Sequence, residues 1–206
     1  MIIKENRNEH SIFIKQFDFT VLDLSDHDVQ TKKIEYNKRP YVRHFIWCYI
    51  FIFYLYLIFE VTGLGSIWNI GKYDEIIRID EINLIPFRSH GVMTYLLNMI
   101  MFMPLGFLLT FIWNERQEIK KVIIVSALFS CAIEICQLFN RRQTDIDDLI
   151  MNTLGAAFGY LIWKIYYGIF KVERDSVTLS AHEPEVYLIL SLLGQFLLYN
   201  WRIFQY

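Results

Sequence analysis

The cysteines and histidines that usually mark a disulfide-linked fold or a metal centre are few and scattered in this sequence. The three cysteines, Cys48, Cys131 and Cys136, lie inside apolar runs and show no C-x-x-C spacing. An odd number of cysteines without a pairing pattern argues against a disulfide framework and predicts small buried apolar residues. No histidine-rich or carboxylate-rich segment offers a partner set for a metal ion. We therefore expect neither a metal nor a cofactor.

An excess of charge of one sign is also lacking. The formal net charge of −2 does not suggest nucleic acid or another strongly charged partner. The opening residues, "MIIKENRNEH", are mostly charged and polar after the third position and do not resemble a signal peptide. What the chain has instead is apolar surface, because 54% of its residues are hydrophobic and 17% are aromatic. These residues are gathered into long runs, which is typical of a membrane protein.

Five apolar stretches approach the roughly 17 to 25 residues that a helix needs to cross a bilayer. They cover residues 41–62, 93–113, 122–139, 149–170 and 186–204, and the last is the weakest because polar side chains interrupt it. We predict an all-α integral membrane protein, a bundle of four to five transmembrane helices. Residues 1–40 form a short N-terminal segment, in which "SIFIKQFDFTVLDL" fits either a small hairpin or a flexible tail. Residues 41–170 form the membrane domain, and residues 171–206 a linker and the fifth helix.

Basic residues predict the orientation of these helices. Lysines and arginines gather before the first helix, between the second and third, and after the fourth, which is one side of the membrane if the helices alternate. That side is predicted to be the cytoplasm. The chain is then a multi-pass cell-membrane protein with a cytoplasmic N-terminus and with loops 63–92 and 140–148 outside. Arg141 and Arg142 lie in an outer loop against this rule, which suggests that they have another role.

Polar side chains on three predicted helices fall at a similar depth near the outer surface. By the helical rise, Glu134 and Gln137 lie near the end of the third helix, Asn98 near the start of the second, and Asn152 near the start of the fourth. A central acid costs about 2.5–3.5 kcal/mol on insertion scales, so Glu134 must be neutral, hydrogen-bonded or paired. We hypothesise that these four side chains and one arginine form a polar nest that opens outward.

Other polar and small residues have structural explanations. Thr144 can cap the fourth helix, with Asp145 and Asp147 complementing the helix dipole. Asp145, Asp148 and Asn152 nevertheless share one stripe of that helix. In "GAAFG", Gly155 and Gly159 allow close helix packing. Pro104 should kink the second helix.

Three of these segments resemble the VanZ-like membrane protein family. They are "NLIPF" from Asn83, "NMIMFMPLGF" from Asn98, which includes Gly106, and "EICQLFNRRQTDIDDLIMNTLGAAFGY" from Glu134. The arginine and acid of the family's R-x-x-D pattern map onto Arg142 and Asp145. The resemblance implies a small polytopic protein of the bacterial cell membrane, and the family's namesake is associated with low-level resistance to teicoplanin.

Three functions remain open at this stage. The first is a non-enzymatic envelope protein whose outward pocket binds an amphiphile, a lipid-linked wall precursor or a lipoglycopeptide, with Arg142 meeting phosphate or carboxylate. The second is an integral-membrane enzyme acting on a lipid head group, with Glu134 or Asp145 as general base. It lacks an evident nucleophile and metal set. The third is a carrier, which the absence of an inverted repeat disfavours. The sequence leaves the oligomeric state open.

Overall fold

The computed structural model describes residues 39–70, 82–87, 91–139, 144–170 and 179–198. Residues 1–43 and 44–206 are separate compact units, and the packing given below lies within the second. The predicted N-terminal hairpin falls on residues 1–38, outside the described part of the chain.

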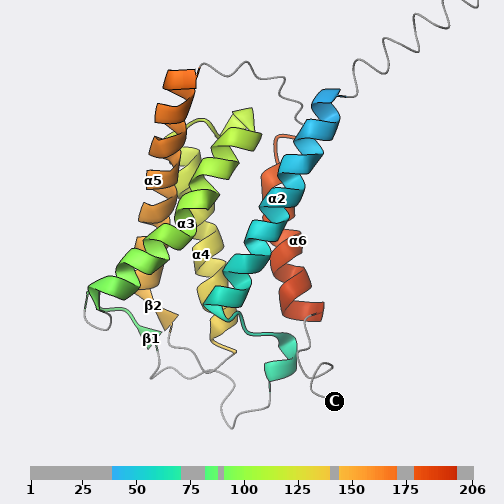
Figure 1. Ribbon diagram of the computed structural model, residues 1–206. Coiled ribbons are helices and arrows are strands. Elements are labelled where there is room, and N and C mark those ends of the chain that lie inside the picture. The colour runs from blue at the N-terminus through green and yellow to red at the C-terminus, as the bar shows by residue number, and fades with distance from the viewer. Residues whose placement is uncertain (1–38, 71–81, 88–90, 140–143, 171–178, 199–206) are drawn as a thin grey trace, which may run out of the picture. The chain divides into compact units, whose positions relative to one another are not determined.

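Five long helices form the described structure (Figure 1). They are α2 (Arg39–Thr62), α3 (Val92–Ile112), α4 (Ile119–Gln137), α5 (Ile146–Phe170) and α6 (Glu183–Leu198). Two single-turn 3-10 helices, η1 (Ile67–Asn69) and η3 (Asn114–Arg116), lie in connections. Two short strands, β1 (Ile82–Asn83) and β2 (Thr144–Asp145), pair in parallel. The predicted helical fold is confirmed, with each helix on an apolar stretch, while the strand pair was not foreseen.

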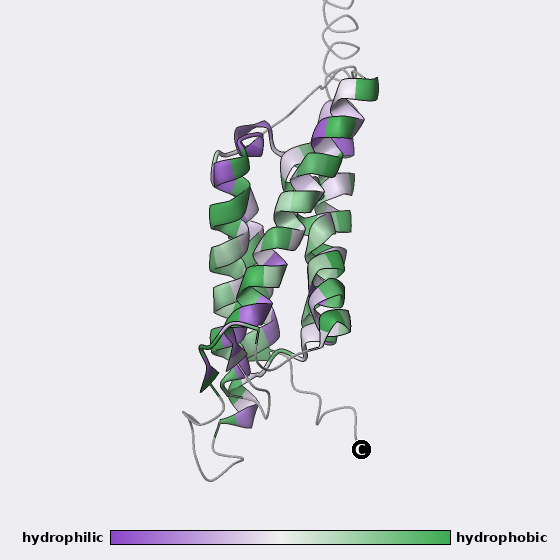
Figure 2. Ribbon diagram, turned by 90° about the vertical axis from the view of Figure 1, so that its left-hand side faces the viewer, coloured by the Kyte–Doolittle hydropathy of each residue, from purple (hydrophilic) through white to green (hydrophobic). Residues whose placement is uncertain are grey.

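Among the described residues, two segments are long and apolar enough to cross a membrane, Pro40–Asn69 and Val92–Ile112. Large apolar side chains also stay exposed on the outside of the bundle, such as Phe53 on α2, Leu128 on α4 and Ile165 on α5, each more than 60% exposed. Figure 2 shows hydrophobic colouring along the middle of the helices and hydrophilic patches near their ends. An apolar exterior of this extent is typical of a surface that faces lipid or a protein partner.

Glycines bring α3 and α5 into backbone contact. A Cβ atom added at Gly155 would lie 2.2 Å from the Met99 carbonyl oxygen, and one at Gly159 would lie 1.8 Å from that of Met103. From the other side, a Cβ at Gly106 would lie 1.8 Å from the Ala156 carbonyl oxygen. Any side chain at these positions would push the helices apart, so the small residues fix the distance between α3 and α5.

Pro104 interrupts α3 at a point where α2 supplies a hydroxyl group. Because Pro104 has no N–H, it cannot donate to the carbonyl of Ile100. One residue further on, the Tyr54 hydroxyl donates to the Met101 carbonyl oxygen at 2.7 Å and accepts from the Leu105 N–H at 3.1 Å. An uninterrupted helix would join those two groups directly, so Tyr54 bridges the hydrogen-bond ladder of α3.

An aromatic core joins α2, α3, α4 and α6. Trp113, Phe51 and Phe102 are fully buried, and the rings of Phe51 and Trp113 meet edge to face with centroids 5.1 Å apart. By contrast, α6 buries only Glu183, Pro184 and Leu188. Its start is held by polar contacts, which include an ion pair between Arg116 and Glu185.

Candidate functional site: a carboxylate and amide cluster

Acidic and amide side chains from four segments meet at one end of the helix bundle. Figure 1 shows this end, where the β1–β2 pair lies beside the start of α3, the end of α4 and the start of α5. The strand pair sets the register, because it places Asn83 opposite Asp145. We call the following residues the acidic cluster: Asn83, Tyr95, Asn98, Glu134, Asp145, Asp147, Asp148 and Asn152.

Asp145 is the junction of the acidic cluster. Its side chain is 1% exposed. One carboxylate oxygen accepts from the Asp147 N–H at 2.9 Å, and the other accepts from the Asn83 amide at 3.1 Å. Its own N–H donates to the Glu134 carboxylate at 3.3 Å. A bond from the second residue of a helix to the preceding side chain is an N-cap, so Asp145 caps α5. The expectation that Thr144 is the cap was wrong, because the Thr144 hydroxyl donates instead to the Glu134 carbonyl oxygen.

Asp147 fastens the segment before α3 to α5. Its buried carboxylate accepts from the Phe87 N–H at 2.7 Å and from the Tyr95 hydroxyl at 2.8 Å. The rings of Phe87 and Tyr95 also pack edge to face with centroids 6.0 Å apart. Phe87 has φ of 62°, a left-handed conformation that is unusual for a bulky residue. Such strain persists only where surrounding contacts hold it, and it occurs preferentially at functional sites.

The amide side chains link the remaining helices. Asn98 on α3 donates to the Asp148 carboxylate at 2.5 Å, and Asn152 on α5 donates to the Ser130 hydroxyl at 2.9 Å. Gln137 near the end of α4 donates to the Thr62 carbonyl oxygen at 2.8 Å. The amide oxygens of Gln137 and Asn152 are buried and have no hydrogen-bond partner among the described residues. Two buried acceptors near the cluster can therefore receive donors from another group.

Most of the predicted site residues lie in or beside this cluster. Asn83, Glu134, Asp145, Asn98 and Asp148 are joined in pairs by the hydrogen bonds given above. Asn152, in the cluster, and Gln137, beside it, bond to neighbours outside the predicted set. Arg142 lies outside the described residues, as does Arg141. The small residues Pro104, Gly106, Gly155 and Gly159 belong to the α3 and α5 packing.

Sequence reasoning missed Tyr95, a member of the acidic cluster, and Ser130, the partner of Asn152, and it did not predict the full role of Asp147. Tyr95 and Ser130 were not singled out, because one tyrosine or serine in an apolar helix gives no signal of its own. Asp147 was placed at the helix start as a dipole partner, whereas its carboxylate bonds to Phe87 and Tyr95. The motif "NLIPF" carried a usable signal, since an asparagine and a proline close together are typical of a turn.

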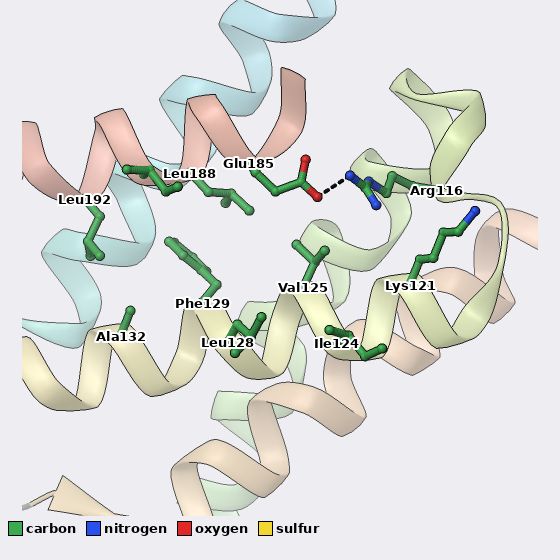
Figure 3. Close-up of a pocket in the computed structure, with 11 residues that line it drawn as sticks. Arg116, Lys121, Ile124, Val125, Leu128, Phe129, Ala132, Glu185, Leu188 and Leu192 are labelled. Carbon is green, nitrogen blue, oxygen red and sulfur yellow. Dashed lines mark ion pairs between the residues drawn. The ribbon is translucent and has the colours of Figure 1, made fainter. Parts of the chain in front are cut away.

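A groove of about 420 Å³ lies elsewhere, between α4 and α6. Figure 3 shows it lined by apolar side chains such as Val125, Phe129 and Leu188, with the Arg116–Glu185 ion pair and Lys121 at one end. Lys121 precedes Glu134 by 13 residues on α4, which is roughly 20 Å along the helix axis. The charged rim of the groove and the acidic cluster therefore lie at opposite ends of the bundle.

Together these features describe a helical protein with two helices able to cross a membrane and a buried acidic cluster at one end of its bundle. A model of the VanZ/LLP1 family matches residues 51–167, from within α2 to near the end of α5, and the chain belongs to this family. The chain is similar to Protein VanZ of Enterococcus faecium, with 38% identity over 88 residues. The aligned region covers 42% of this chain and 52% of that relative, about half of its length. No solved structure matches the chain.

Proposed function

We propose that this protein crosses the cell membrane with four or five helices and that its acidic cluster faces outward, where it binds the polar part of an amphiphilic envelope ligand. The ligand class is a lipid-linked wall precursor or a lipoglycopeptide. Binding there would let the protein contribute to resistance against teicoplanin. The observation that carries the proposal is the meeting of four carboxyl groups from α4, β2 and α5 with amides from β1 and α3.

The distribution of charge supports the orientation. Arg116 lies in the connection before α4, and Lys120 and Lys121 lie in the first turn of α4. The acidic cluster lies at the far end of that helix. Basic residues gather on the cytoplasmic side of membrane proteins. The N-terminus is then cytoplasmic, and the loops before α3 and before α5 are extracytoplasmic. This side is where wall precursors and lipoglycopeptides are exposed.

The chemistry of the cluster supports a polar ligand group with hydrogen-bond donors. Glu134, Asp145 and Asp148 offer carboxylate acceptors, and Asn152 adds an amide oxygen with no partner among the described residues. Amides, hydroxyls and amines of sugars and peptides donate to such groups. Arg142, adjacent in sequence, can bind a phosphate or carboxylate through two parallel hydrogen bonds. A ligand anchored by lipid would meet these groups at the membrane surface.

Susceptibility to two glycopeptides tests the proposal. Cells that express the protein are expected to need more teicoplanin, but not more vancomycin, for inhibition. Glu134→Ala and Arg142→Ala should abolish the protection, while Lys120→Ala at the opposite end should retain it. Immunoblots of membrane fractions check that all variants are present in equal amounts. Protection that survives both substitutions, or that extends equally to both drugs, would contradict the proposal.

A further inference from the structure

A second buried polar cluster lies at the opposite end of the bundle from the acidic cluster. His44 and Cys48 lie one turn apart on α2, and Glu183 is the first residue of α6. The His44 Nε2 atom lies 2.8 Å from a Glu183 carboxylate oxygen and 3.4 Å from the Cys48 sulfur. The Cys48 sulfur lies 3.9 Å from the same carboxylate oxygen. All three side chains are buried.

Neighbouring residues enclose the side chains of His44, Cys48 and Glu183 and fix the orientation of Glu183. The Trp113 ring packs edge to face against the His44 ring, with centroids 6.4 Å apart, and closes one side. The Tyr187 hydroxyl adjoins both Cys48 and Glu183 from the next turn of α6. The second carboxylate oxygen of Glu183 accepts from the Leu179 N–H at 3.3 Å. Glu183 therefore keeps one oxygen directed at His44 and Cys48 while its other oxygen is fixed by backbone.

We propose that His44, Cys48 and Glu183 bind a divalent transition-metal ion of the zinc type. Their three ligand atoms all lie within 4.8 Å of one another. Zinc bonds of about 2.0–2.3 Å to nitrogen, oxygen and sulfur in a tetrahedron require ligand atoms roughly 3.3–3.8 Å apart. The observed separations of 2.8, 3.4 and 3.9 Å bracket that range, so small side-chain movements suffice.

Charge and ligand chemistry favour the same ion. Imidazole, thiolate and carboxylate are the three side-chain ligands that zinc uses, and this mixture does not suit calcium or magnesium. A thiolate and a carboxylate balance the charge of a divalent ion when His44 is neutral. The complete site is then electrically neutral, which lowers the cost of burying it among apolar side chains. The Tyr187 hydroxyl or a water molecule would complete four-coordination.

The proposed role of the ion is to fasten α6 to α2. Of its sixteen residues, α6 buries only Glu183, Pro184 and Leu188, so apolar packing holds this helix weakly. A metal bond at its first residue would fix the end of α6 that lies beside Arg116. Structural zinc sites contribute directly to folding free energy. The inference is independent of the proposed ligand site, which lies at the other end of the bundle.

Metal analysis of the full-length protein tests the inference. The protein is expressed in medium with added zinc, purified in mild detergent with an affinity tag that contains no histidine, and assayed for metal per chain. We expect about one equivalent in the wild type and more than about a hundredfold loss of metal affinity in Cys48→Ser and His44→Gln, beyond the roughly 10–100-fold effect typical of outer-shell partners. Cys131→Ser is the matched control, since Cys131 is exposed on α4, and should keep the metal.

Cobalt substitution gives a second readout that does not depend on the stability of a variant. The wild type loaded with Co²⁺ should show a thiolate-to-metal charge-transfer band in the near ultraviolet, and Cys131→Ser should show the same band. A chelator should lower the melting temperature of the wild type. A wild-type protein that binds no zinc and shows no such band overturns the inference, and the three residues then form only an ion pair with a neighbouring thiol. Equal metal content in the wild type and Cys48→Ser, both monodisperse on gel filtration, overturns it as well.

Discussion

The carboxylate of Asp147 accepts a hydrogen bond of 2.7 Å from the backbone N–H of Phe87, 60 residues earlier in the chain. This bond holds the strained turn of the "NLIPF" segment against the first turn of α5. With the bond from Tyr95 to the same carboxylate, it connects the segment before α3 to the helix that carries Asp148 and Asn152. The shape of the acidic cluster therefore depends on Asp147, whose side chain is fully buried.

Asp147→Ala should destabilise the protein by about 2–4 kcal/mol, because it leaves two hydrogen-bond donors without an acceptor. Asp147→Asn keeps one carbonyl acceptor and should cost less. Thermal or denaturant unfolding in detergent measures the difference. An Asp147→Ala variant as stable as the wild type would show that these bonds do not hold the turn.

Gly155→Ala and Gly159→Ala should each lower stability by about 1–3 kcal/mol, since the new methyl group meets the backbone of α3. Gly168→Ala is the matched control on the same helix, because nothing lies within 4 Å of a Cβ at that position. The control should be neutral or slightly stabilising, given the better helix propensity of alanine. Similar melting temperatures for all three variants would argue against close contact of α3 and α5.

Tyr54→Phe should cost about 1–3 kcal/mol, because it removes the hydroxyl between the Met101 carbonyl and the Leu105 N–H. The aromatic ring is retained, so the loss reports the hydrogen bonds and not the packing. Tyr56→Phe on the exposed side of α2 serves as control. Amide hydrogen exchange of the α3 segment should quicken in Tyr54→Phe alone, and unchanged exchange would rule out the bridging role.

Cysteine labelling tests the orientation. In a background without the three native cysteines, Gln143→Cys in the loop before α5 should react with a membrane-impermeant reagent applied to intact cells. Gln117→Cys, between α3 and α4, should react only after the membrane is opened. Labelling in the reverse pattern would place the acidic cluster on the cytoplasmic side.

The positions of the helices could be predicted because long apolar runs specify them without reference to partners. The observed α3 (Val92–Ile112) differs from the predicted stretch 93–113 by one residue at each end. The final helix is described from Glu183 to Leu198, and the rest of the predicted stretch, residues 199–204, lies outside the described residues. The β1–β2 pair could not be foreseen, since strands of two residues have no periodicity to read.

The sequence predicted which side chains of the candidate site lie at a similar depth, but it did not predict which of them form hydrogen bonds with each other. The helical rise placed Asn98 and Glu134 near one surface, yet rise alone does not say which side chains face each other. The bond from Asn98 to Asp148 and that from the Asp145 N–H to Glu134 depend on how α3, α4 and α5 rotate about their axes. Likewise, Glu183 gave no sign of meeting His44, because 139 residues separate them.

Direct binding tests the central claim, that the acidic cluster is an outward ligand site. The full-length protein in lipid nanodiscs is titrated with a lipid-linked wall precursor and with teicoplanin, and vancomycin serves as the ligand without a lipid tail. At least one of the two lipid-tailed ligands should bind saturably, with affinity more than about tenfold weaker in Glu134→Ala and unchanged in Lys120→Ala, as expected for loss of a buried hydrogen-bond partner. Saturable binding that is equal in the wild type and Glu134→Ala, or no binding of either lipid-tailed ligand to the wild type, would contradict the account.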